Sequence, residues 1–114
     1  MATVSTHVLD TSTGRPARAM EVTLESDSGR LVGSATTDAD GRIAPFGSGP
    51  PEPPTQLEPG GYRLRFDTGA WFATTGTPGF YPEVTITFTI VDADEHYHVP
   101  LLLNPFGYST YRGS

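Results

Sequence analysis

Cysteine and lysine are both absent from this chain of 114 residues. Without cysteine the protein forms neither a disulfide nor a catalytic thiolate, and the composition leans toward a reducing compartment. No apolar run approaches the length of a membrane-spanning helix. The N-terminus lacks a basic stretch followed by an apolar core, so no secretory signal is predicted. We therefore expect a cytoplasmic protein that does not enter membranes.

The charge is also one-sided, because the seven basic residues are all arginine and the formal net charge is −6. An acidic chain is a poor partner for nucleic acid and for anionic membranes. Any anionic small molecule must then be met by locally placed arginine, which directs attention to Arg42 and Arg112. We interpret Arg15, Arg18 and Arg30 as solvated surface charges.

Several motifs that carry chemistry are missing. The sequence has no Gly-x-Ser-x-Gly elbow, no glycine-rich phosphate loop and no His-Glu-x-x-His zinc motif. Part of a calcium-binding loop is suggested by Asp38, Asp40 and Gly41. The twelfth position of such a loop would be Gly47 rather than the required glutamate, so a calcium site is not predicted. His7, His96 and His98 still offer three imidazoles, so a zinc hydrolase stays open as an alternative.

What the chain does contain is hydrophobic alternation with a period of two. Val84, Ile86, Phe88 and Ile90 alternate with threonines, a pattern typical of a half-buried antiparallel strand. The same pattern and the Gly/Pro/Asp turns between segments predict an all-β, two-sheet sandwich of about eight strands. These strands are expected at residues 5–9, 20–25, 31–37, 42–46, 62–67, 84–90, 97–103 and 107–112.

The remaining segments are short. Residues 69–76 are expected to form one short helix, capped by Asp67 or Thr68 and ended by Gly76. Residues 47–54, rich in glycine and proline, are expected to be an extended surface loop. Asp40-Gly41 predicts a tight turn. Nothing divides the chain, so residues 1–114 are expected to be a single domain.

Residues 101–103 are all leucine and break the alternation. Apolar side chains on both faces of a strand indicate that both faces are covered. Because the outer face of a lone sandwich is wet, we expect another subunit to cover this strand.

The last two strands bring chemically active side chains together. A turn centred on Asn104-Pro105 would place His98 opposite Tyr111, with Ser109 a diagonal neighbour on the same face. Leu101 and Leu103 would share that face, and a surface mixing imidazole, phenol, hydroxyl and leucine is typical of a pocket.

Two further candidates lie upstream. His7 alternates with Val8 on the first strand, and Arg42 opens the strand after the Asp40-Gly41 turn. Spacing alone does not place His7 beside His98, and a solvated turn arginine is the ordinary interpretation of Arg42.

Five stretches together resemble a known family, the transthyretin-like 5-hydroxyisourate hydrolases, over nearly the whole chain. They are residues 5–10 (STHVLD), 13–17 (TGRPA), 36–42 (TTDADGR), 80–84 (FYPEV) and 96–114. The terminal tetrapeptide, residues 111–114 (YRGS), is the most specific, because transthyretin proper, a hormone carrier of the same fold, lacks it.

The resemblance implies a transthyretin/prealbumin-like homotetramer with active sites in the channel at the dimer–dimer interface. It implies hydrolytic opening of the ring amide of 5-hydroxyisourate, the purine-derived product of urate oxidation. The product would be 2-oxo-4-hydroxy-4-carboxy-5-ureidoimidazoline. No cofactor and no metal are implied.

Within that resemblance, His7 and His98 are expected to activate water and to carry its proton to the leaving nitrogen. Arg42 is expected to stabilise the developing oxyanion. Tyr111 and Arg112 would hold the heterocycle, Ser109 and Ser114 would complete the lining, and His96 is assigned a supporting role.

Two alternatives besides the zinc hydrolase are kept. One is a non-enzymatic transthyretin-like carrier of a small molecule, because a fold alone does not decide function. The other is a secreted structural sandwich, which the absence of a predicted signal disfavours.

Overall fold

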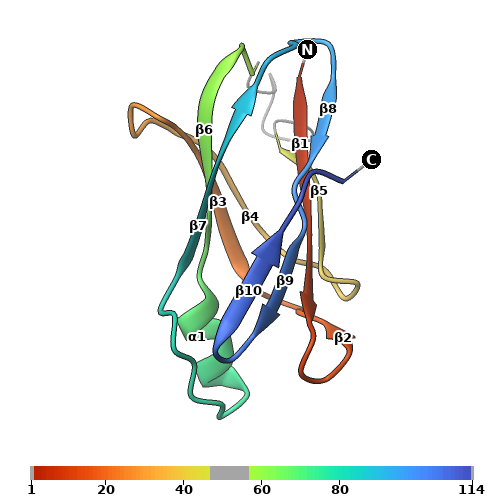
Figure 1. Cartoon of the computed structure of the whole chain (residues 1–114), viewed down its shortest axis with the longest axis vertical. Helices are drawn as coiled ribbons and strands as arrows, with labels where there is room; N and C mark the ends of the chain where they lie inside the picture. Colours follow the sequence, from red (N-terminus) through yellow and green to blue (C-terminus); the bar gives the residue numbers. More distant parts are fainter. Residues whose placement is uncertain (1, 47–56, 114) are drawn as a thin grey trace.

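Two sheets form the body of the protein in a computed structural model that describes residues 2–46 and 57–113 (Figure 1). The first sheet has six strands and is built around β1, and the second has four strands in the order β4-β3-β6-β7. The elements are β1 (Thr3–Asp10), β2 (Arg15–Pro16), β3 (Glu21–Ser26), β4 (Leu31–Thr36), β5 (Arg42–Phe46), β6 (Gly60–Phe66), α1 (Thr68–Thr74), β7 (Val84–Ile90), β8 (His96–His98), β9 (Leu101–Asn104) and β10 (Gly107–Thr110). The predicted β-sandwich with one short helix is confirmed.

The core lies between the sheets because each strand buries every second residue. On β1 the side chains of Val4, Thr6 and Val8 are buried, whereas Ser5 and His7 lie half-buried on the opposite face. Each fully buried valine or leucine contributes about 1.5–3 kcal/mol relative to an exposed one. Burial of the even residues therefore determines that the odd residues of β1 point out of the sandwich.

The strand predicted over residues 97–103 divides into β8 and β9. Val99 and Pro100 are both buried, but the alternation continues from β8 into β9 without a shift, and both strands keep the same register against β1. Proline has no backbone N–H to donate to a ladder, while the Val99 carbonyl accepts a 2.6 Å hydrogen bond from the buried Thr6 hydroxyl. Leu101 and Leu103 lie an odd number of residues from His98, so they point to the opposite face, into the core. The prediction that they share the face of His98 is wrong.

Leu102 occupies the outer face instead. It lies opposite Leu9 of β1, and both side chains are half-buried in the single chain. The strand is therefore fully buried on its core face, whereas its outer face is only half-buried in the single chain. Coverage of Leu102 by another subunit stays a prediction.

The hairpin between β9 and β10 turns one residue later than predicted. Asn104 pairs with Gly107, which makes Pro105 and Phe106 the turn residues. The Asn104 side-chain oxygen accepts the Phe106 N–H at 2.9 Å, an Asx turn that keeps Asn104 at the end of β9. This register pairs His98 with Gly113, so the predicted pairing of His98 with Tyr111 is wrong.

The helix α1 follows the expected caps. Asp67 is the N-cap, and Gly76, with φ of 68°, lies just beyond the C-cap Thr75. The helix is anchored by Phe72, which is buried, and by Trp71, whose indole N–H donates to the Arg18 carbonyl at 2.8 Å. Within the described ranges no helix combines the length and the apolar content that a membrane crossing requires.

Candidate active site on the outer face of β1

The outer face of β1 brings together the three histidines of the chain. β5 lies antiparallel to β1 and places Arg42 directly opposite His7. β8 runs parallel to β1 on the register that pairs Ser5 with His98 and Thr3 with His96. Directly paired residues on neighbouring strands share a face. The topology therefore gathers three imidazoles and one guanidinium on one surface, although these residues lie far apart in the sequence.

A continuous chain of hydrogen bonds runs along this surface. The Ser5 hydroxyl lies 2.8 Å from His98 Nδ1 and 2.8 Å from His96 Nε2. The other nitrogen of His96, Nδ1, lies 2.5 Å from the Thr3 hydroxyl. Ser5 thus bridges two imidazoles, which fixes the orientation of the half-buried His98 ring and connects it to the exposed His96.

Burial and neighbouring charge set the proton affinity of His98. Desolvation lowers the pKa of His98 below its ordinary value of 6.5, and the positive charges of Arg42, His96 and His7 lower it further. A lowered pKa keeps the imidazole neutral near pH 7. His98 therefore has the protonation state that a general base needs.

Arg42 is positioned by the turn that precedes β5. The Asp38 carboxylate accepts the backbone N–H groups of Asp40 and Arg42, both at 2.9 Å. The hydrogen bond from the Arg42 N–H is the largest cause that lowers the pKa of Asp38. The Gly41 carbonyl then accepts the Val8 N–H at 2.8 Å, which fastens the turn to β1 beside His7.

Gly41 is required at this turn for two reasons. Its φ is 74°, and a Cβ built on it would collide with the Val8 carbonyl oxygen. We expect Gly41→Ala to lower the free energy of unfolding by about 1–3 kcal/mol from backbone strain alone, with an added cost from the collision. Urea denaturation measures this loss.

Gly14 offers a matched control, since its φ is 73° and nothing lies within 4 Å of a Cβ built on it. Gly14→Ala should show the strain without the collision. Equal losses for the two variants would contradict the close approach of the turn to β1.

The C-terminal segment returns to this face beside His98. The Gly113 N–H donates to the His98 carbonyl at 2.8 Å. A Cβ on Gly113 would come within 2.5 Å of His98 Cδ2, so only glycine allows the segment to lie against the imidazole. Ser109 also belongs to this side of the sheet, because it pairs with the outward-facing Leu102.

Arg112 is turned to the other side of β8. Its guanidinium donates to the Glu95 carboxylate at 2.7 Å, and its Cζ lies 4.5 Å from the centroid of the Tyr97 ring. Tyr97 points into the core, away from His96 and His98, and its hydroxyl accepts the Val91 N–H at 3.0 Å. The structure therefore does not bring Arg112 to the imidazoles within one chain.

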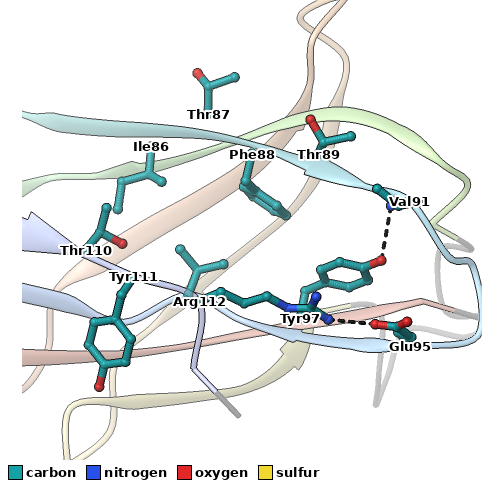
Figure 2. A pocket seen from close by; sticks show the side chains of 11 residues that line it. Ile86, Thr87, Phe88, Thr89, Val91, Glu95, Tyr97, Thr110, Tyr111 and Arg112 are labelled. Carbon is teal, nitrogen blue, oxygen red and sulfur yellow. Dashed lines mark hydrogen bonds and ion pairs between the residues drawn. The ribbon is translucent and has the colours of Figure 1, made fainter.

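A cavity of about 550 Å³ opens on that second side, between β7 and the C-terminal segment. Figure 2 shows Phe88, Tyr97 and Arg112 around it, and shows the Tyr111 ring turned away from Phe88. The cavity is thus separate from the face that carries His7, Arg42 and His98. Ser114, the last of the predicted contacts, and the loop predicted over residues 47–54 lie outside the described residues.

Ser5 and Thr3 are the side chains that sequence reasoning missed. Alternation does place both on the face of His7, but it does not identify β8 as the neighbour of β1.

Among residues 2–46 and 57–113 there is no group of three potential ligands arranged to hold a metal ion.

Comparison with known proteins finds relatives over the whole fold. Residues 4–113 match the HIUase/Transthyretin family. A protein named 5-hydroxyisourate hydrolase 2 from Rhizobium meliloti (strain 1021) is 44% identical, over 97% of this chain and 95% of that protein.

Solved structures agree with this comparison. The structure of Klebsiella pneumoniae 5-hydroxyisourate hydrolase superposes with a TM-score of 0.86 at 43% identity, covering 100% of this chain and 94% of the other. Sea bream transthyretin, solved in complex with thyroxine, superposes with a TM-score of 0.81 at 27% identity, covering 96% of this chain and 93% of the other.

Proposed function

Because the chain belongs to the HIUase/transthyretin family, we propose that it is a 5-hydroxyisourate hydrolase that opens the ring amide of its substrate with water. The product is 2-oxo-4-hydroxy-4-carboxy-5-ureidoimidazoline. The observation that carries the proposal is the convergence of His7, Arg42 and His98 on one face of the first sheet. These groups supply the two functions that amide hydrolysis requires, proton transfer and stabilisation of an oxyanion.

His98 is proposed as the base that activates water. Ser5 engages its Nδ1, so Nε2 is the nitrogen that accepts the proton. As the water oxygen bonds to the carbonyl carbon, its proton passes to His98. When the ring C–N bond breaks, a proton must reach the leaving nitrogen, and His7 on the same face is proposed to deliver it.

Arg42 is proposed to stabilise the negative charge that develops on the carbonyl oxygen. Its guanidinium stays protonated and offers several donors in one plane. A donor aimed at a developing oxyanion contributes about 3–4 kcal/mol to the lowering of the barrier. The strand register, which places Arg42 opposite His7, supports this role.

The C-terminal segment is proposed to hold the heterocycle. Ser109, Tyr111 and Ser114 would contribute hydrogen bonds and stacking. Arg112 retains donors beyond the one that Glu95 accepts, and these are proposed to reach the substrate. The enzyme is further proposed to need no metal or other cofactor, to be cytoplasmic, and to form a homotetramer with its sites at the dimer–dimer interface, as one domain spanning residues 1–114.

A second candidate function is that of a small-molecule carrier. The likeness to sea bream transthyretin with thyroxine favours it. However, an apolar ligand gains nothing from desolvating an arginine and three imidazoles. A carrier would bind a ligand and release it unchanged, whereas a hydrolase would consume it.

The direct test is to generate 5-hydroxyisourate in situ with urate oxidase and to follow its ultraviolet decay in EDTA. We expect catalytic acceleration that persists in the chelator, with sedimentation giving a tetramer. A folded protein that leaves the spontaneous decay unchanged would exclude the hydrolase, and activity abolished by EDTA would reinstate the zinc alternative.

The pH dependence follows from the direction of the His98 pKa. A base must be neutral, so kcat/KM should fall as pH decreases through the pKa of His98. Because burial and the charges of Arg42, His96 and His7 lower that pKa, the acid limb should lie below 6.5. A limb at or above 6.5 would contradict His98 as the base. The measurement is kcat/KM against pH at constant ionic strength.

A further inference from the structure

We propose that Thr3, His96, Ser5 and His98 form a proton relay that carries the proton taken from water out of the site to solvent. The inference rests on the proposed hydrolase function and extends it, because it assigns positioning and proton-transfer roles to Ser5 and His96. Its basis is the unbroken series of contacts at 2.5, 2.8 and 2.8 Å from Thr3 through His96 and Ser5 to His98.

The proton count of this series allows only two arrangements for neutral imidazoles. A serine hydroxyl has one proton, so Ser5 donates to one imidazole and accepts from the other. In the first arrangement His98 Nδ1–H donates to Ser5, Ser5 donates to His96 Nε2, and His96 Nδ1–H donates to the Thr3 oxygen. His98 Nε2 is then unprotonated and able to act as a base.

In the second arrangement every hydrogen bond is reversed. Thr3 donates to His96 Nδ1, His96 Nε2–H donates to Ser5, and Ser5 donates to His98 Nδ1. His98 Nε2 then carries the proton and acts as an acid. Reversing the direction of the series therefore converts His98 from base to acid without moving a heavy atom.

His98 in the first arrangement takes a proton from water on Nε2 and becomes an imidazolium. Its Nδ1 proton passes to the Ser5 oxygen while the Ser5 proton passes to His96 Nε2. His98 is then neutral again with its proton on Nε2, and the positive charge lies on His96. Release of the His96 Nδ1 proton to solvent completes the transfer and leaves the series in the second arrangement. Loss of the His98 Nε2 proton and uptake of a solvent proton at His96 Nδ1, with the bridging protons moving back, restore the first arrangement before the next turnover. No oxidant or other reactant is involved.

The surroundings give the relay a direction. His98 is half-buried, and its burial and the nearby Arg42, His7 and His96 disfavour a positive charge on its ring. His96 is exposed, so its cationic form is hydrated. Hydrolysis of an amide to a carboxylate at neutral pH releases a proton when the leaving nitrogen is not basic. An outlet from the site is then needed in every turnover.

The test compares Ser5→Ala with Ser5→Thr in the decay assay. Ser5→Ala removes the bridging hydroxyl, and we expect kcat to fall about tenfold, the value of one hydrogen bond, with KM changed less than twofold. Ser5→Thr keeps a hydroxyl on a strand residue and should recover most of the rate. In Ser5→Ala, added imidazole buffer should raise kcat by replacing the relay, while the wild-type rate stays independent of buffer.

Ser34→Ala is the matched control, since Ser34 is an exposed serine on β4 of the other sheet and should leave the rate unchanged. His96→Gln should show the same buffer dependence as Ser5→Ala. A Ser5→Ala rate equal to wild type, or a loss that neither buffer nor Ser5→Thr restores, would overturn the relay.

Nitrogen NMR of the imidazoles separates the relay from the proposed reaction. With the relay intact, His98 and His96 should each be held in one tautomer, with the proton on Nδ1. In Ser5→Ala, His98 should no longer be held in that single tautomer. Unchanged tautomers in Ser5→Ala would overturn the relay even in an active enzyme. An inactive wild-type protein with fixed tautomers would instead refute the hydrolase alone.

Discussion

Replacing His98 by glutamine is expected to lower kcat by about 100-fold or more, the contribution of a positioned general base. Glutamine keeps polar atoms at the site but cannot take up a proton. The backbone bond between Gly113 and His98 does not involve the imidazole and should persist. The measurement is the in situ decay assay, run beside thermal unfolding to show that the variant is folded.

His96→Gln is the natural comparison for this variant. His96 lies two residues away on the same face, but it contacts His98 only through Ser5. Its replacement should cost about tenfold, the scale of one hydrogen bond. A His98→Gln enzyme that keeps more than a tenth of the wild-type rate would remove His98 from proton transfer.

Replacing Arg42 by glutamine is expected to lower kcat by about 100-fold, because a donor to the oxyanion is lost. A second effect concerns the pH dependence. The charge of Arg42 lowers the pKa of His98, so its removal should move the acid limb of the pH profile upward, toward 6.5. Both effects are measured by recording kcat and kcat/KM as functions of pH, because kcat/KM reports the pKa of His98 in the free enzyme.

Arg30→Gln provides the matched control. Arg30 is an exposed arginine in the turn before β4, and its replacement changes the net charge by the same amount without touching the site. It should leave both the rate and the acid limb in place. A rate loss in Arg42→Gln without any shift of the acid limb would contradict the placement of Arg42 beside His98.

Most of the sandwich can be predicted from the sequence because alternation is a local property. The threonine-separated residues of β7 and the alternating residues of β3 and β6 read directly as strands, and their antiparallel pairing is confirmed. The division of β8 from β9 was not predicted. Alternation continues through Pro100, and the break in the ladder has no signal in the sequence beyond the missing N–H of Pro100 itself.

The candidate site depends on non-local pairing and is harder to predict. His7 and His98 were both identified, but only the parallel alignment of β8 with β1 places them on one face. The hairpin register was missed because the Asx turn at Asn104 moves the turn centre by one residue. That single step replaces Tyr111 by Gly113 as the neighbour of His98.

Substrate is proposed to bind and react on the outer face of β1. The chain has three histidines, and all of them lie on this face, so its imidazole NMR spectrum reports on the site alone. The measurement is to titrate the protein with a urate-like heterocycle that inhibits the decay of 5-hydroxyisourate competitively. We predict that the His7 and His98 signals shift at saturation and that Arg42→Gln weakens the effect. A competitive inhibitor that saturates the protein and leaves all the imidazole signals in place would show that substrate binds elsewhere.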